Sequence, residues 1–121
     1  MNRLILEMGM GNDLYGQDYT KAACRAVQDA IHHSSLTLFS SLGLDHAKMR
    51  VRVTLGVQAP EAVDRKVVAA ELPRGVAEVS VVKGGIDIYD PERDSISVVA
   101  NAAIEAFYEI PQGEWKLSGS Q

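Results

Sequence analysis

The feature that most constrains the fold of this chain is an apolar stripe with helical spacing between residues 19 and 31. Its members recur every three or four positions, and charged side chains such as Lys21 and Arg25 lie off it. The stripe consists of Tyr19, Ala22, Ala23, Ala26, Val27, Ala30 and Ile31. Asp18 precedes it and suits an N-cap, because a carboxylate accepts hydrogen bonds from first-turn amides. The pattern predicts a helix that begins at this cap.

Three segments have strand patterns. Residues 3–9 form a short apolar run closed by glycine, which is too short to nucleate a helix. Residues 49–57 alternate apolar and polar side chains, which is typical of a half-buried strand. Residues 76–83 predict a third strand, which ends at a pair of glycines.

The remaining segments are less regular. Pro60 opens a second predicted helix, with Val63, Val67 and Ala70 on its inner side, which ends before Pro73. Residues 34–48 predict a structured connection, and the acidic, proline-marked residues 86–94 predict an exposed one. Residues 95–110 satisfy both strand alternation and helical spacing. A strand is favoured because the β-rich start and a hairpin back onto the third strand suit it, although the alanines favour a helix.

The expected fold class is α+β, a two-layer β-α-β-α-β-β sandwich with a four-stranded mixed sheet and both helices on one face. The opposite face then needs a cover, and we expect a homo-oligomer through this polar sheet face. Its expected residues are Arg3, Glu7, Arg50, Arg52, Thr54, Glu78, Ser80, Ser97, Asn101 and Glu105, interrupted by Ile5, Val82 and Val99.

Length and charge limit the function. The 121 residues predict one α+β domain over 1–110 and a polar C-terminal tail over 111–121. The net charge of −4, with no clustered basic patch, argues against nucleic acid as a partner. No apolar run is long enough to span a membrane, and the lone Cys24 favours a reducing compartment, so we expect a cytoplasmic protein.

The segment from Gly9 to Asp18 is the candidate ligand site, expected as a loop between the first strand and the first helix. Its glycines would let backbone amides approach a ligand, and the helix that follows begins with a positive dipole end. The expected ligand-binding residues are Gly9, Gly11, Asn12, Asp13, Tyr15 and Gly16. The alternative is a tight structural turn in which Asp13 is a turn or cap residue.

The same segment carries a family resemblance. The opening Leu-Ile-Leu-Glu-Met-Gly-Met-Gly-Asn-Asp-Leu-Tyr-Gly-Gln-Asp-Tyr-Thr-Lys-Ala, with Val-Thr-Leu-Gly-Val and Asn-Ala-Ala-Ile-Glu later, resembles a small family of uncharacterised bacterial and plant proteins with a GxGxDxHG motif. The resemblance implies a shared fold and a candidate site, and it implies no reaction. Tyr15 stands where that family has histidine, and because a phenol is a poor ligand for divalent metals, no metal site is expected here.

Three functions are consistent with these residues. The first is the binding of a small polar or anionic metabolite at residues 9–18 of a homo-oligomer. The second is an enzyme, of hydrolase, lyase or isomerase type, that uses Asp13 as acid or base, or as a remaining metal ligand, with no cofactor assigned. The third is a structural or assembly subunit without a ligand. Cys24 has no neighbour in the sequence that would activate it, so a nucleophilic role is disfavoured.

Overall fold

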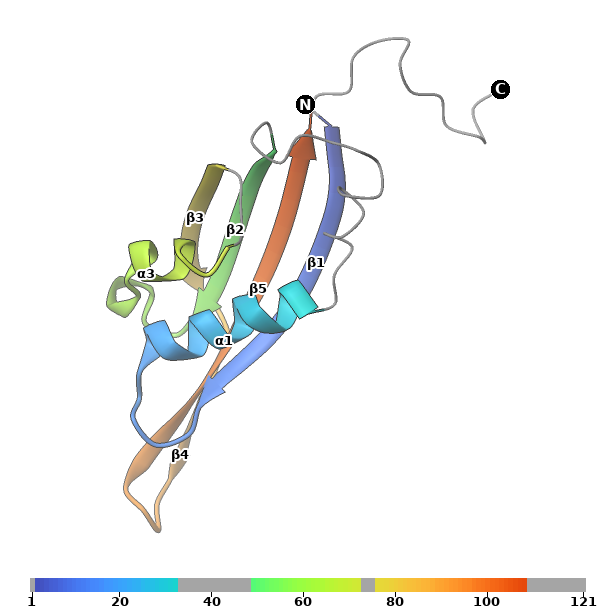
Figure 1. Cartoon of the computed structure of the whole chain (residues 1–121). Helices are drawn as coiled ribbons and strands as arrows, with labels where there is room; N and C mark the ends of the chain where they lie inside the picture. Colours follow the sequence, from blue (N-terminus) through green and yellow to red (C-terminus); the bar gives the residue numbers. More distant parts are fainter. Residues whose placement is uncertain (1, 33–48, 73–75, 109–121) are drawn as a thin grey trace, which may run out of the picture.

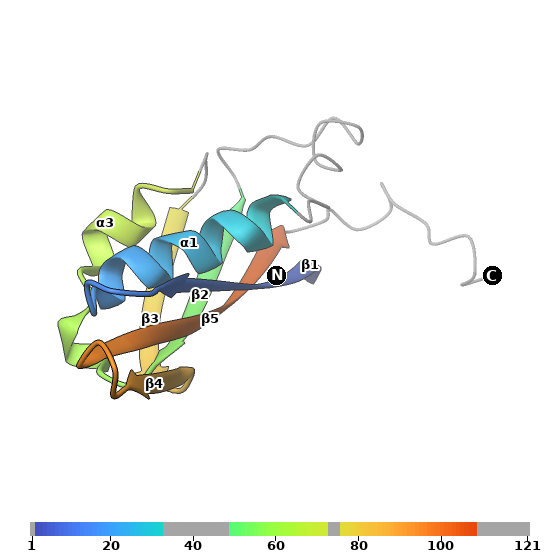
Figure 2. The ribbon, with the colours of Figure 1, turned by 90° about the horizontal axis from the view of Figure 1, so that it is seen from below.

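The structure is a computed structural model, which describes residues 2–32, 49–72 and 76–108 (Figure 1). The predictions for residues 34–48 and for the tail 111–121 lie outside these ranges. The described part is α+β, with five strands in one open mixed sheet. Two α-helices cover one face of the sheet, as predicted, and Figure 2 shows both of them above it.

The sheet has the strand order β1-β5-β2-β3, and β4 pairs with β5. The strands are β1 (Asn2–Asp13), β2 (Arg50–Val57), β3 (Val76–Lys83), β4 (Ile86–Asp90) and β5 (Ser95–Tyr108). β2 and β3 are parallel, whereas β5 runs antiparallel to β1, β2 and β4. The long β5 is therefore the centre of the sheet.

The strand predicted in residues 95–110 is confirmed over Ser95–Tyr108, and the helical alternative is wrong. The expected hairpin back onto the third strand is also wrong, because β5 forms its hairpin with β4 and pairs with β1 and β2. On β5 the small side chains Ala100, Ala102 and Ala106 are buried. A row of alanines on a central strand leaves room for a helix to approach the sheet closely. This is why alanines, which favour helices elsewhere, occur here in a strand.

The helix α1 (Tyr19–His32) begins as its sequence predicts. The Asp18 side chain accepts a hydrogen bond from the amide of Lys21 at 3.0 Å, and the Asp18 carbonyl accepts from the amide of Ala22 at 3.0 Å. Asp18 is thus the N-cap. The alanines and Val27 of the stripe are buried against β1 and β5.

The predicted second helix is divided in two. A 3-10 turn, η2 (Pro60–Ala62), is followed by extended backbone at Val63, and α3 (Arg65–Ala69) then begins at a new N-cap. The cap is Asp64, whose side chain accepts from the amides of residues 66 and 67 at 3.0 and 3.3 Å. This restart rotates the helix, so Val68 is buried and Val67, the residue expected inside, is 46% exposed.

The predicted exposed connection over residues 86–94 is also wrong in its first half, which forms β4. Gly85, at φ +62°, turns the chain out of β3 so that the next residues pair with β5. The side chain of Asp87 on β4 accepts a hydrogen bond from the Tyr19 hydroxyl at the start of α1. β4 is therefore attached to both layers, which its acidic composition does not reveal.

The sheet face away from the helices, the open face, is less polar than its sequence pattern suggests. A β-bulge between Arg3 and Ile5 shifts the register of β1 against β5. From that point Ile5 and Glu7 lie on the helix side, not on the open face as expected. Apolar side chains of β1 and β4 take the outer positions. They are Leu6, Met8, Met10, Ile86 and Ile88.

The closest contact between the two layers lies where β1 passes under α1. A methyl group at Gly9 would lie 2.5 Å from the carbonyl oxygen of Ala26, and one at Gly11 would lie 2.5 Å from the carbonyl oxygen of Ala22. No side chain fits at these distances. The glycines at positions 9 and 11 therefore belong to a strand that packs on the helix backbone, and not to a loop as expected.

This packing predicts that Gly11→Ala destabilises the protein by about 3 kcal/mol, at the upper end of what overpacking costs, because α1 must move off the sheet. Urea unfolding followed by circular dichroism measures the loss. Asn12→Ala, on the next residue of the same strand but with an exposed side chain, is the control and should change stability by less than about 1 kcal/mol. Equal losses in the two variants would contradict the close packing.

The hydrogen bond between Tyr19 and Asp87 gives a second prediction. This bond is the main cause that raises the pKa of Tyr19 above its usual 10.0. Because the pKa in the folded state is higher than in the unfolded state, the bond contributes its full stability below pH 10.0 and loses it as the pH rises through the folded-state pKa. Tyr19→Phe should therefore cost about 1 kcal/mol at neutral pH.

The measurement is the unfolding free energy of both proteins from neutral to alkaline pH. The difference between them should shrink at the alkaline end. A difference that stays constant or grows with pH would contradict the role given to the hydroxyl.

Candidate functional site

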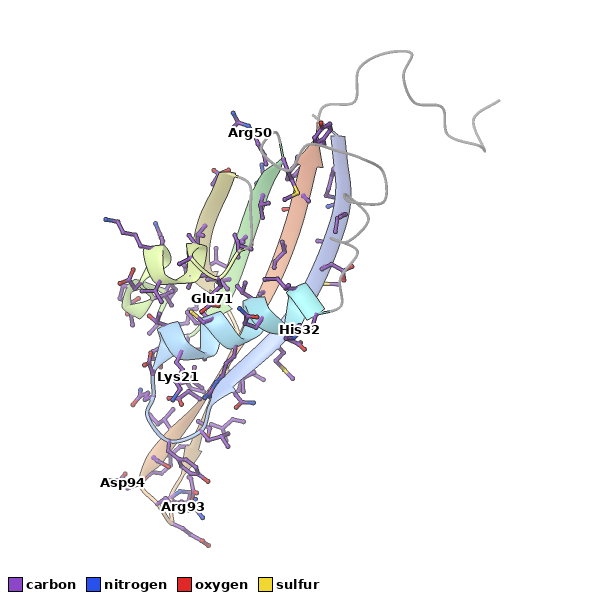
Figure 3. All side chains as sticks on the ribbon, viewed as in Figure 1. Lys21, His32, Arg50, Glu71, Arg93 and Asp94 are labelled. Atoms are coloured by element: carbon purple, nitrogen blue, oxygen red, sulfur yellow. The ribbon has the colours of Figure 1, made fainter. Side chains whose placement is uncertain are left out.

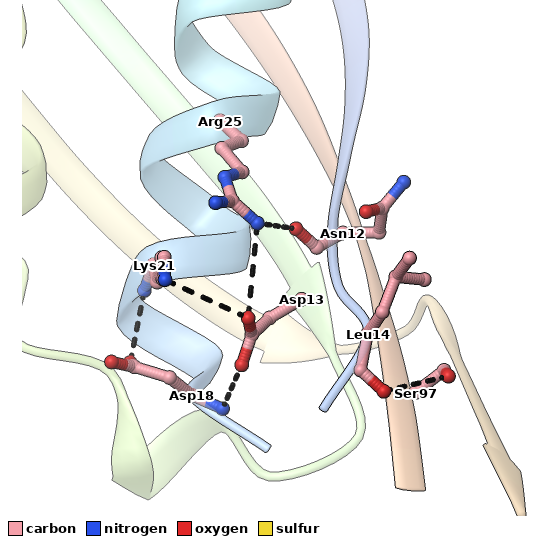
Figure 4. Close-up of polar contacts among 7 residues, drawn as sticks. All are labelled: Asn12, Asp13, Leu14, Asp18, Lys21, Arg25 and Ser97. Atoms are coloured by element: carbon pink, nitrogen blue, oxygen red, sulfur yellow. Dashed lines mark hydrogen bonds and ion pairs between the residues drawn. The ribbon is translucent and has the colours of Figure 1, made fainter. Parts of the chain in front are cut away.

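A hollow of about 460 Å³ lies at the end of β1, beside the first turns of α1. Figure 4 shows most of its polar residues from the helix side. The strand end, the turn over residues 14–16 and the outer face of α1 form its walls. It is lined by Asn12, Asp13, Leu14, Tyr15, Gly16, Asp18, Lys21 and Arg25.

Asp13 is the buried polar residue at this site, with 6% of its surface exposed. Its Oδ2 accepts a hydrogen bond from the amide of Asp18 at 2.9 Å. Its Oδ1 lies 3.7 Å from Nη1 of Arg25 and 4.0 Å from Nζ of Lys21. One carboxylate oxygen therefore closes the turn before the helix, while the other attracts two cations to the wall of the hollow (Figure 4).

Gly16 makes the inward position of Asp13 possible. A methyl group at residue 16 would lie 2.8 Å from Oδ2 of Asp13, in the space that the carboxylate occupies. The next residue, Gln17, has φ 49°, so the chain turns sharply just before Asp18. The segment is thus a tight turn around one carboxylate.

Lys21 and Arg25 were not singled out from the sequence as site residues. They are four residues apart on the polar side of α1, so both project over the same turn of helix. Nη1 of Arg25 donates a hydrogen bond to the carbonyl of Asn12 at 2.6 Å. Their side chains are still 54% and 49% exposed. The sequence signal that could have identified them is the i, i+4 spacing of two cations just after the predicted start of the helix, where the helix dipole is positive.

The expected ligand-binding residues do not all come together. Asn12, Asp13, Tyr15 and Gly16 line the hollow. Gly9 and Gly11 do not, because they face the backbone of α1 from inside the sheet.

Tyr15 lies at the rim of the hollow and is held from the other side. Its hydroxyl accepts a hydrogen bond from Nη1 of Arg93 at 2.7 Å, and the guanidinium stands 5.2 Å from the ring centre. The neighbouring Leu14 carbonyl accepts from the Ser97 hydroxyl at 3.0 Å. The hairpin of β4 and β5 therefore supports the outer wall.

The charges at this site are unsuited to a metal ion. In the parts of the chain that the structure describes, no group of three or more His, Cys, Asp or Glu side chains could hold one. The two cations at 3.7 and 4.0 Å from Asp13 would also repel a divalent ion from its free oxygen. Two half-exposed cations, Lys21 and Arg25, thus face the hollow together with the carboxylates of Asp13 and Asp18.

The comparisons with known proteins agree with the α+β fold. The chain belongs to a conserved hypothetical protein family, Lin0512, which it matches over residues 3–106. The expectation of an uncharacterised family is confirmed. A search of the curated proteins found no match.

A solved structure is similar over nearly the whole chain. It is the crystal structure of an FtsZ-like protein of unknown function from Nostoc punctiforme, with 38% sequence identity and a TM-score of 0.79. The similarity covers 90% of this chain and 97% of that one. Within the described ranges, no helix is long and apolar enough to cross a membrane.

Cys24 on α1 does not line the hollow and is poorly suited to be a nucleophile. Burial is the main cause that raises its pKa to about 11, and the nearby Glu71 adds to the shift. Because the thiolate is the reactive form, very little of it exists near neutral pH. The expectation against a nucleophilic role thus gains a physical reason.

We predict that Cys24 of the folded protein reacts with iodoacetamide at least tenfold more slowly at pH 7.5 than a free cysteine of ordinary pKa near 8.5. The rate should keep rising with pH towards 11. The unfolded chain in urea is the control. Reaction at the rate of the unfolded chain would contradict the buried environment.

Proposed function

We propose that this protein binds a small anionic metabolite, carrying a phosphate or carboxylate group, in the hollow beside α1. The observation that carries the proposal is the pair of half-exposed cations, Lys21 and Arg25, held at the wall of the hollow by the inward-turned Asp13. The volume of about 460 Å³ falls in the range of small-molecule sites, roughly 300–1,000 Å³.

The cations keep bonding capacity for a ligand. Their distances of 3.7 and 4.0 Å from Oδ1 of Asp13 are longer than the roughly 2.7–2.9 Å of a charge-assisted hydrogen bond. Arg25 has five N–H donors, and Nη1 is the one that contacts the Asn12 carbonyl. A ligand anion could therefore accept from both side chains while Asp13 continues to hold them in place.

Asp13 supports binding better than it supports acid–base catalysis. Its Oδ2 is occupied by the amide of Asp18, and its Oδ1 faces two cations. A group so placed orients neighbours and is poorly placed to exchange a proton with a substrate. The solved relative, FtsZ-like and of unknown function, supplies no reaction either.

A structural subunit without a ligand is the second candidate. It is favoured by the position of Gly9 and Gly11 against the α1 backbone, which gives these glycines a packing role. It is also favoured by the hydrogen bond that Asp13 makes inside its own turn. In that case the two cations serve only to neutralise Asp13.

A thermal-shift screen against phosphorylated and carboxylated metabolites, followed by calorimetry on any hit, tests the proposal. A ligand that binds only the folded state raises the melting temperature, by several degrees at a concentration of about 100 times Kd. Lys21→Gln is the test variant, since its long ion pair with Asp13 adds little stability. It should weaken binding at least tenfold, as the loss of a charged hydrogen bond of about 1.5–3 kcal/mol requires.

Lys66→Gln is the matched control, because Lys66 is an exposed lysine on α3 that does not line the hollow. It should bind the ligand as the native protein does. If no anion raises the melting temperature, or if Lys21→Gln binds as tightly as the control, the ligand proposal is wrong. The structural candidate then remains.

A further inference from the structure

We infer that two copies of this chain pack open face against open face, in an antiparallel two-fold dimer. Sheet faces that pack in this way lie about 10 Å apart, with side chains interdigitated between them. The inference rests on a surface away from the hollow and does not depend on the ligand proposal. Three observations carry it: the apolar middle of the face, the opposite charges at its two ends, and its size.

The middle of the open face is apolar. Met8 and Met10 on β1 are 67% and 58% exposed, and Ile86 and Ile88 on β4 are 58% and 53% exposed. Between them on β5 lie Ala103, opposite Met8, and Val99, opposite Ile86, with the exposed Asn101 between these two. Val82 on β3, 50% exposed, extends the patch to the other edge. Apart from Asn101, the middle of the face is thus apolar, and monomers rarely expose an apolar surface of this size.

One end of the face is basic. At the carboxyl end of β5, Arg3 and Arg50 both lie opposite Phe107, and Arg52 lies opposite Glu105. Arg52 pairs with Glu105 at 3.8 Å and also stands over the Phe107 ring at 5.1 Å. Its side chain stays 51% exposed, as does that of Arg3. With Glu78 also on this face, three arginines meet two glutamates.

The other end is acidic. The turn between β4 and β5 carries Asp90, Glu92 and Asp94 against the single cation Arg93. The Arg93 guanidinium contacts Tyr15 on the side of the hollow, and its Nε lies 4.0 Å from Oδ2 of Asp90. Three carboxylates and one cation leave this end with a net charge of −2. Figure 3 shows Arg50 and this turn at opposite ends of the sheet.

This polarity determines the direction of stacking. If two copies stack in parallel, the arginine end meets an arginine end, and the acidic turn meets an acidic turn. If they stack antiparallel, each arginine end lies over the acidic turn of the other copy, and the apolar middles still coincide. A two-fold axis that lies in the plane of the face and perpendicular to the strands produces the second arrangement and makes both end contacts equivalent.

The size of the face is that of a stable interface. At about 3.3 Å per residue, the 14-residue β5 gives the length of the face. At about 4.8 Å between neighbouring strands, the order β1-β5-β2-β3 gives its width, so the face covers roughly 700 Å². Standard interfaces bury about 800 Å² on each partner. The interface would close on itself, leaving the helix layers outside and both hollows open to solvent.

Analytical ultracentrifugation of the full chain tests the inference. The native protein should sediment at twice the 13.1 kDa of one chain. Met8→Glu places a charge in the apolar middle and should raise the dissociation constant roughly 100-fold or more. Val67→Glu is the matched control, because Val67 is 46% exposed on α3, in the helix layer. It should leave the dimer intact.

A full charge reversal tests the direction of stacking. The variant Arg50→Glu/Arg52→Glu/Glu92→Lys/Asp94→Lys should form a dimer with itself and not with the native chain, because only parallel stacking would join opposite charges in the mixed pair.

Two half-reversed variants test whether the charged ends lie in the interface. The variant Arg50→Glu/Arg52→Glu and the variant Glu92→Lys/Asp94→Lys should each be monomeric, because each places like charges together at both ends. Mixed in equal amounts, they should form a heterodimer, because every end contact then joins opposite charges. Circular dichroism confirms that each variant is folded.

A native protein that sediments as a monomer at micromolar concentrations would overturn the inference. The open face would then be covered by a different protein or exposed to solvent. A dimer that survives Met8→Glu but not Val67→Glu would also overturn the inference. A Met8-sensitive dimer would contradict the antiparallel arrangement if its fully reversed variant paired with the native chain, or if the two half-reversed variants did not associate on mixing.

Discussion

The close contact between the β1 glycines and the backbone of α1 is the constraint on which the rest of this structure depends. Gly9 and Gly11 have no side chain to separate the layers, and the alanines of α1 and β5 allow the same short distance. A large side chain at either glycine would lift the helix away from the strand. The sheet-and-helix spacing is therefore determined by the smallest residues in the chain, and the larger apolar side chains fill the volume beyond them.

The same contact positions the candidate site. Asp13 ends the strand and Asp18 begins the helix, so the distance between the layers sets the distance between the Asp13 carboxylate and the cations of α1. The helix also completes the edge of β1, because Asp29 accepts from the amide of Met10 at 2.9 Å and Arg25 donates to the carbonyl of Asn12. One arginine thus covers a strand edge and lines the hollow.

Much of the fold follows from local sequence patterns, and the departures have local physical causes. The helix over residues 19–32 and the strand over residues 50–57 are confirmed because their periodicity is unbroken, and the strands predicted over residues 3–9 and 76–83 are confirmed as parts of β1 and β3. The errors arise where one residue changes the geometry. The bulge after Arg3 exchanges the two faces of β1, Asp64 restarts a helix, and Gly85 turns an acidic segment into a paired strand.

The candidate site was also predicted in part, because some of its residues have local sequence signals and others do not. Asp13 and Asp18 are visible in the sequence because carboxylates before a helix have a recognised capping role. The cations Lys21 and Arg25 are hidden because charged side chains on the outer side of a helix are the ordinary case. Their contribution depends on where the strand end lies in space, and periodicity does not contain that information.

Nuclear Overhauser effects between the Gly11 α-protons and the amide protons of residues 25 and 26 test the central claim most directly. The account predicts strong cross-peaks, because at Gly11 a methyl group would lie within 2.6 Å of the Arg25 carbonyl carbon. Their absence, in a spectrum that shows the β1–β5 contact between Gly11 and Ala100, would contradict it. The sheet would then be present without the close helix layer that positions the site.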